Sequence, residues 1–132
     1  MAARPAYLID TSVLIWSGAE PERISDAAMA ALLDSAALLR YSLVSVWEMQ
    51  IKHSLGKLPL PDAANLTVAR FANAIQAELL APTLEHIGRL YELPRIHSDP
   101  FDRMLVAQAI HEDLTFVCPD PAIARYPVRV LW

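Results

Sequence analysis

Short apolar runs that end in polar turn residues alternate along this chain with longer stretches of helical periodicity. The apolar runs predict β-strands at Tyr7–Ile9, Leu38–Tyr41, Leu79–Ala81, Leu114–Cys118 and Val128–Leu131. The periodic stretches predict helices at Val13–Trp16, Ser25–Leu33, Val46–Leu55, Asp62 to about Leu79, Thr83–Tyr91, Asp99–His111 and Ala122–Arg125. This alternation predicts a three-layer α/β/α sandwich with a mainly parallel central sheet, built as a single domain over residues 1–132.

Helix-end signals support several of these boundaries. Asp99 suits an N-cap, Pro100 the first helical position and Asp102 the third, which is a D-x-x-D variant of the capping box. Ser45 and Glu48 have the S-x-x-E spacing of a second capping box, which places the start of that helix after a turn at residues 42–45. These acids therefore have a structural explanation before any chemistry is considered.

The composition is that of a packed globular protein, with 55% apolar and 20% charged residues. The lone Cys118 excludes an intramolecular disulfide and favours a reducing compartment. Met1–Pro5 does not resemble a signal peptide, and no apolar run is long enough to cross a bilayer, so we expect a cytoplasmic protein. The net charge of −4 argues against non-specific nucleic-acid binding, unless several acids gather in one site and leave the 11 Lys and Arg for a basic rim.

Acidic residues follow predicted strands or occupy the first turns of predicted helices. Asp10 and Asp120 follow strands, Glu48 and Asp102 lie near helix starts, and Asp99 is a fifth acid nearby. A parallel sheet gathers the carboxyl ends of its strands at one edge, so we expect these side chains to converge. Converging carboxylates repel one another, and their pKa values rise unless a cation neutralises them. Hard oxygen ligands favour Mg²⁺ or Mn²⁺, which suit phosphodiester hydrolysis.

Other catalytic schemes lack their residues. The chain has no phosphate-binding G-x-x-x-x-G-K-[ST] loop, no G-x-G-x-x-G loop, no G-x-S-x-G elbow and no clustered Cys and His for zinc. His86 is expected on the surface, and His97 is not assigned as a general base. Trp16, Trp47 and Trp132 are expected in the core or at a dimer interface.

Four blocks of this sequence, in order and at similar spacing, resemble the PIN-domain toxins called VapC. The blocks are Leu8–Trp16, Val44–Leu58, His97–Ala109 and Phe116–Ile123. The resemblance implies a Mg²⁺- or Mn²⁺-dependent endoribonuclease that is the toxin of a type II toxin–antitoxin pair. It also implies a homodimer, inhibited by a VapB-like antitoxin whose C-terminal segment occupies the active-site groove.

Carried onto this chain, the resemblance implies that Asp10, Glu48 and Asp102 are the core catalytic and metal-binding acids and Asp120 the fourth. Asp99 matches the first aspartate of the D-P-F-D-R block and is either a metal ligand or only a helix cap.

Neighbouring polar residues complete the expected site. Thr11 or Ser12 would cap the first helix and orient Asp10 or a bound water. Arg103 and Lys52 are the basic residues expected to contact RNA or antitoxin. Ser12 stands where the family often has His, and Cys118 where Thr is common, but neither change removes a ligand.

Two rival interpretations remain open. In the first, the acids only cap helices and the chain is a non-catalytic partner-binding module. In the second, the same fold acts on DNA rather than RNA, which the short chain and the lack of additional helical arches disfavour.

Overall fold

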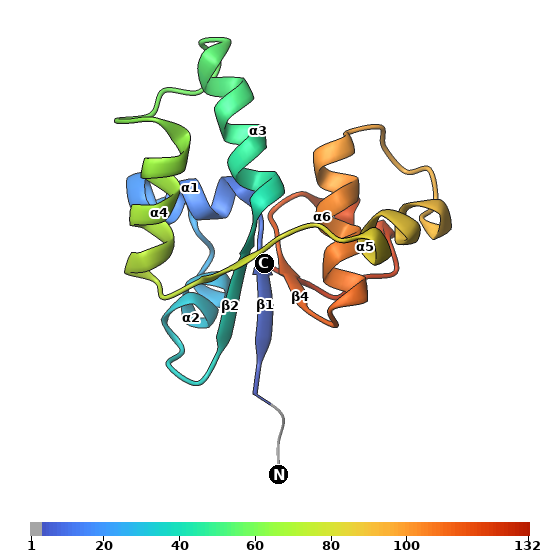
Figure 1. Cartoon of the computed structure of the whole chain (residues 1–132). Coiled ribbons are helices and arrows are strands. Elements are labelled where there is room, and N and C mark those ends of the chain that lie inside the picture. The colour runs from blue at the N-terminus through green and yellow to red at the C-terminus, as the bar shows by residue number, and fades with distance from the viewer. Residues whose placement is uncertain (1–3) are drawn as a thin grey trace.

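The computed structural model describes residues 4–132, so the sequence expectation for Met1–Pro5 falls largely outside the described residues. Its centre is a five-stranded sheet in the order β3-β2-β1-β4-β5, and every neighbouring pair is parallel. The strands are β1 Ala6–Ile9, β2 Leu38–Ser42, β3 Glu78–Leu80, β4 Thr115–Val117 and β5 Val130–Leu131. Helices cover both faces (Figure 1), which confirms the predicted α/β/α architecture.

The helices are α1 Thr11–Ala19, α2 Asp26–Leu33, α3 Leu43–Ser54, α4 Ala64–Ala74, α5 Leu84–Arg89 and α6 Pro100–His111. Short 3₁₀ turns lie at Pro21–Arg23, Leu90–Glu92 and Pro121–Arg125. None of the described helices combines the length and the apolar character needed to span a bilayer.

Successive residues of β1 pack into two separate hydrophobic clusters, one on each face of the sheet. Ile9 packs into a cluster with side chains of α1, α2 and α4, whereas Leu8 packs with Phe116 and Leu105 on the α6 side. Both Leu8 and Ile9 are completely buried. The alternation follows from the two-residue period of a strand that is covered on both faces.

The register places the ends of the central strands together. Ile9 is paired with Tyr41 of β2 and with Val117 of β4. The carboxyl ends of β1, β2 and β4 therefore lie side by side at one edge of the sheet. Helix α1, helix α3 and the segment after β4 all begin at this edge. This edge is the one on which the acids were expected to meet.

The start of α3 differs from the sequence prediction. Ser42, the last residue of β2, is the N-cap, and its hydroxyl accepts a hydrogen bond from the Val44 N–H at 3.0 Å. The predicted capping box of Ser45 and Glu48 is therefore wrong, because both residues lie inside the helix and are buried. The buried Ser42 hydroxyl also donates to Oε1 of Gln108.

The boundaries of α4 and α1 also differ from those predicted from the sequence. The helix predicted from Asp62 to Leu79 is shorter, since α4 ends at Ala74 and Gln76 takes a left-handed conformation with φ of 56°. Helix α1 begins at Thr11 with Asp10 in the N-cap position, so neither Thr11 nor Ser12 is the cap.

The predicted start of α6 is confirmed. Oδ1 of Asp99 accepts hydrogen bonds from the N–H groups of Phe101 at 2.9 Å and Asp102 at 3.3 Å, and Pro100 is the first helical residue. The expectation that His86 is a surface residue is wrong, because His86 is a residue of α5 whose side chain is completely buried.

Candidate functional site

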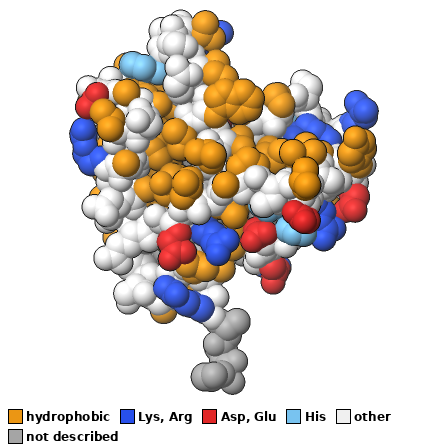
Figure 2. Space-filling model, in the orientation of Figure 1, with side chains coloured by type: hydrophobic (Ala, Val, Ile, Leu, Met, Phe, Trp, Pro, Cys, Tyr) orange, Lys and Arg blue, Asp and Glu red, His pale blue; other side chains and the backbone are white. Residues whose placement is uncertain are grey.

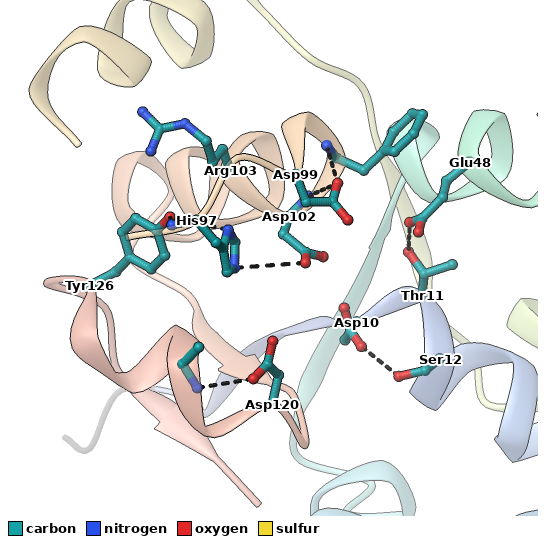
Figure 3. A network of polar contacts seen from close by, with 12 residues as sticks. Asp10, Thr11, Ser12, Glu48, His97, Asp99, Asp102, Arg103, Asp120 and Tyr126 are labelled. Carbon is teal, nitrogen blue, oxygen red and sulfur yellow. Dashed lines mark hydrogen bonds and ion pairs between the residues drawn. The ribbon is translucent and has the colours of Figure 1, made fainter. Parts of the chain in front are cut away.

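A cavity of about 700 Å³ opens at the carboxyl edge of the sheet. All five predicted acids line it: Asp10, Glu48, Asp99, Asp102 and Asp120. Lys52, Lys57 and Arg23 contribute positive charge to its wall, and Trp16 and Leu58 contribute apolar surface. Figure 3 shows four elements that supply the acids, namely the β1–α1 junction, α3, the start of α6 and the segment after β4.

Asp10 lies at the bottom of the site, where β1 passes into α1. Only 8% of its surface is exposed. Burial, with a further contribution from the negative charge of Glu48, raises the pKa of Asp10 to about 6. The Ser12 hydroxyl donates a hydrogen bond of 2.5 Å to Oδ2 of Asp10 and partly opposes this rise. Ser12 therefore has the orienting contact that the sequence suggested for it.

Glu48 projects from the second turn of α3 and is 4% exposed. The Thr11 hydroxyl lies 2.8 Å from Oε1 of Glu48 and 2.8 Å from the Ser45 hydroxyl. Because Thr11 has a single hydroxyl proton, it donates to the carboxylate and accepts from Ser45. The other oxygen, Oε2, accepts from the Lys52 ammonium at 2.5 Å. Thr11 thus orients Glu48 rather than Asp10.

Asp102 occupies the first turn of α6 and faces Asp10 across the cavity (Figure 3). Burial, which is the largest cause, and the charges of the four other acids together raise the pKa of Asp102 to about 7. A carboxylate with this pKa holds its proton at neutral pH far more often than an exposed aspartate, unless a cation offsets the crowding. Asp99 contributes to that crowding, and one of its oxygens is committed to the helix cap.

Asp120 enters the site from the segment after β4. Its Oδ1 accepts a hydrogen bond of 2.9 Å from the Ala122 N–H, which fixes the carboxylate above a 3₁₀ turn. One of its oxygens lies within 4.8 Å of an oxygen of Asp102 and of a ring nitrogen of His97. Asp120 is exposed, so this side of the site is the one open to solvent.

The donor set fits a divalent cation. The five predicted acids line one cavity, together with Glu20, and among the described residues Lys52 is the one lysine or arginine that forms an ion pair with any of those five. All of the acid donors are hard oxygen atoms, which is the ligand chemistry of Mg²⁺ and Mn²⁺.

A family model described as the PIN domain matches residues 7–128. The chain belongs to the PIN-domain family. No curated protein matches the sequence closely enough to be reported as a relative.

Two solved structures share the PIN fold of this chain. One is described as VapBC2 from Rickettsia felis bound to a DNA fragment from their promoter. It matches with a TM-score of 0.73 and 16% identity over 96% of this chain and 97% of that one. The other, VapBC-1 from nontypeable Haemophilus influenzae, matches with a TM-score of 0.61 and 13% identity over 96% of each chain.

Lys52 and Arg103, the two basic residues expected to contact RNA or antitoxin, are placed differently relative to this PIN-domain site. Lys52 lies in the cavity, but the Arg103 guanidinium points away from the acids (Figure 3). It donates to the carbonyl oxygens of Pro94 at 2.9 Å and Leu90 at 3.4 Å, and so ties the loop before α6 to the helix. An RNA or antitoxin contact of Arg103 stays a prediction.

Sequence reasoning missed the pairing of His97 with Tyr126. The His97 backbone N–H donates to the Tyr126 hydroxyl at 3.3 Å, and Nδ1 lies 3.3 Å from the same oxygen. The His97 ring is thereby directed toward Asp102, with Nε2 at 3.8 Å from Oδ2. The two residues are 29 positions apart, so local spacing gave no signal of the contact.

Proposed function

We propose that this PIN-domain chain is a Mg²⁺- or Mn²⁺-dependent endoribonuclease. The observation that carries the proposal is the convergence of all five predicted acids on one cavity, where Asp102 has its pKa raised to about 7. The parallel sheet brings these residues to one edge, and the proposal rests on the crowding of their charges there rather than on their separate roles at helix ends. A divalent cation neutralises the negative charge of such a site. Without the cation, the carboxylates repel one another and destabilise the folded state.

Asp10, Glu48 and Asp102 are the proposed principal ligands, with Asp120 as the fourth and Asp99 as an additional ligand or a cap only. A bound cation would lower the pKa of an attacking water and stabilise charge on the leaving oxygen. Cleavage would leave 5′-phosphate and 3′-hydroxyl ends.

Three neighbouring residues would prepare these acids for metal binding. Ser12 holds Asp10 and Thr11 holds Glu48 through hydrogen bonds, which keep both buried carboxylates in fixed rotamers. Lys52 would bind a substrate phosphate once the metal takes over the neutralisation of Glu48.

The cavity walls favour a single-stranded or loop region of RNA as substrate. Positive charge from Lys52, Lys57 and Arg23 lies beside the acids and could bind phosphates on either side of the cleaved bond. The Arg23 guanidinium lies 4.3 Å from the centroid of the Trp16 ring, so this wall also offers a flat cationic surface to an unpaired base. DNA remains the alternative substrate.

We further propose that the protein acts in the cytoplasm as the toxin of a type II pair, with a VapB-like antitoxin that covers this cavity. Cations beside the acids would attract acidic residues of such a partner. The fold shared with chains of two VapBC structures supports this choice.

A homodimer is proposed through a second surface. Figure 2 shows apolar side chains gathered across the face that carries α3 and α5. Trp47 and Leu43 of α3 and Leu84, Ile87 and Tyr91 of the α5 region are exposed. Five large uncharged side chains are more typical of a permanent self-association surface than of a transient one.

The decisive test is cleavage of single-stranded RNA and DNA of the same sequence by the purified protein in EDTA, Mg²⁺ and Mn²⁺. RNA cleavage that needs the metal supports the proposal, and preferred DNA cleavage selects the alternative nuclease. Absence of both cleavage and calorimetric Mn²⁺ binding favours the non-catalytic partner-binding module. Size-exclusion chromatography with light scattering tests the dimer, which Trp47→Arg should dissociate.

A further inference from the structure

His97 presents a buried nitrogen atom to the acids of the site. Its ring packs edge-on against Tyr126, with 5.5 Å between the ring centroids, and both its backbone N–H and its Nδ1 contact the Tyr126 hydroxyl. The ring is therefore held in one orientation. That orientation directs Nε2 toward Asp102, as Figure 3 shows.

The Nε2 atom has no hydrogen-bond partner among the described residues, although it is buried. Its nearest acceptor is Oδ2 of Asp102, and their separation of 3.8 Å is too long for a hydrogen bond. A buried polar atom without a partner costs about 1–3 kcal/mol, and such atoms are rare in folded proteins. An atom of this kind that faces two carboxylates indicates a missing cation.

The local geometry fits one ion. Nε2 of His97, one oxygen of Asp102 and one oxygen of Asp120 all lie within 4.8 Å of one another. Two ligands on opposite sides of a metal with bonds of about 2.1 Å lie up to about 4.2 Å apart, so small side-chain adjustments suffice. Neutral imidazole can supply the third bond, because Nδ1–H can donate to the Tyr126 hydroxyl and leave the lone pair on Nε2.

We propose that His97 is a nitrogen ligand of the divalent metal held by Asp102 and Asp120, and that it makes this position prefer Mn²⁺ to Mg²⁺. The inference rests on the proposed metal-dependent function and extends it. Asp10 and Glu48 supply only oxygen, which Mg²⁺ accepts readily, whereas imidazole favours first-row transition metals. His97 lines a separate pocket with Arg95, Ser98 and Arg103 and is not among the residues that line the main cavity.

A second group with ligand-like spacing, formed by His86, His111 and Glu112, does not fit a metal. Nδ1 of His86 accepts the Thr83 N–H at 3.0 Å, and Nδ1 of His111 accepts from Arg89 at 3.3 Å. Each neutral ring therefore carries its proton on Nε2, the atom that would have to bind the ion. This group is a hydrogen-bonded network that joins α5 to the end of α6.

The test is electron spin echo spectroscopy of Mn²⁺ bound to the wild-type protein, which detects the nuclear spin of a directly bound nitrogen. We expect ¹⁴N modulation in the wild type and its loss in His97→Phe, which keeps an aromatic ring against Tyr126. The matched control is His53→Phe, since His53 is exposed on α3 and, among the described residues, its ring forms a hydrogen bond only with the Leu58 carbonyl. Calorimetry should show that His97→Phe weakens Mn²⁺ binding roughly tenfold and Mg²⁺ binding much less.

Mn²⁺ bound by the wild type without ¹⁴N modulation would overturn the role of His97 and leave the proposed nuclease intact. The same conclusion follows if His97→Phe leaves the ratio of Mn²⁺ to Mg²⁺ affinity unchanged. Failure of the wild type to bind Mn²⁺ at all would overturn both proposals. The wild-type spectrum needs no variant, so a folding defect in His97→Phe cannot obscure the result.

Discussion

The Lys52 ammonium and the Glu48 carboxylate form an ion pair of 2.5 Å within α3, one helical turn apart. The Glu48 end is buried, whereas the Lys52 side chain is 48% exposed. The hydrogen bond to Glu48 raises the pKa of Lys52, so the ammonium keeps its charge at neutral pH. Lys52 therefore provides the positive charge that Glu48 needs when no metal is bound.

Replacement of Lys52 by Met should strengthen metal binding and weaken RNA binding. An arriving dication no longer competes with the ammonium for Glu48, so we expect the Mn²⁺ Kd to fall about fivefold, equivalent to about 1 kcal/mol. RNA affinity should decrease, and its salt dependence should lose about one phosphate contact. Calorimetry and RNA-binding titrations at several salt concentrations measure both effects.

Lys57→Met is the matched control for this variant. Lys57 lines the same cavity and forms no ion pair with a described residue, so its removal should weaken RNA binding without tightening Mn²⁺ binding. Equal Mn²⁺ affinity in Lys52→Met and the wild type would contradict the role assigned to the ion pair.

Asp10→Asn should abolish metal binding and cleavage while it preserves the fold. The amide keeps the shape of a buried side chain but removes the anionic ligand, so RNA cleavage should fall by roughly a hundredfold or more. Calorimetry with Mn²⁺, RNA cleavage and circular dichroism together check this outcome. Asp26→Asn, an exposed position on α2, is the control and should behave as the wild type does.

The stability of the metal-free protein should decrease as the pH rises from about 4 to about 7. Asp102 has a folded-state pKa of about 7 against its ordinary value of 3.8, so the folded chain holds a proton that the unfolded chain has already released. The free energy of unfolding then falls with pH across this window. Asp102→Asn removes this loss and should stabilise the metal-free protein at pH 8 by about 1–2 kcal/mol, a value reduced for partial solvent screening.

Urea denaturation in EDTA at pH 5 and pH 8 measures this difference. The gap in unfolding free energy between Asp102→Asn and the wild type should be larger at pH 8. A gap that is the same at both pH values would show that the Asp102 carboxylate is not crowded in the folded state.

Arg103→Met should affect stability more than RNA binding. The guanidinium holds two carbonyl oxygens before α6, and its loss leaves them without that donor, at a cost of about 1–2 kcal/mol. RNA affinity at matched folded fraction should change less than in Lys52→Met. A large loss of RNA affinity with unchanged thermal stability would instead support the contact with RNA or antitoxin that the sequence suggested.

The fold and the convergence of the acids could be predicted because both depend on local patterns repeated along the chain. Apolar runs marked the strands, and a parallel sheet has one carboxyl edge, so Asp10 and Asp120 had to meet there. The helix cap at Asp99 was predictable for the same reason, since Asp-Pro at a helix start is a local signal.

Contacts between distant residues could not be predicted in this way. Ser42, rather than Ser45, caps α3, and its hydroxyl also donates to Gln108, 66 positions away in the sequence. His86 is buried because its ring satisfies the Thr83 N–H and Glu112 together. In each case, the side chain has a partner far away in the sequence, and the local pattern gave no signal of that partner.

The position of β1 at the centre of the sheet has a consequence for the timing of synthesis. Its last residue, Ile9, pairs on one side with Val117, which is translated much later than Ile9. Asp120, on the wall opposite Asp10, emerges later still. A chain translated only as far as β4 still lacks Asp120, so the five acids can meet in one cavity only after the segment that follows β4 has been translated.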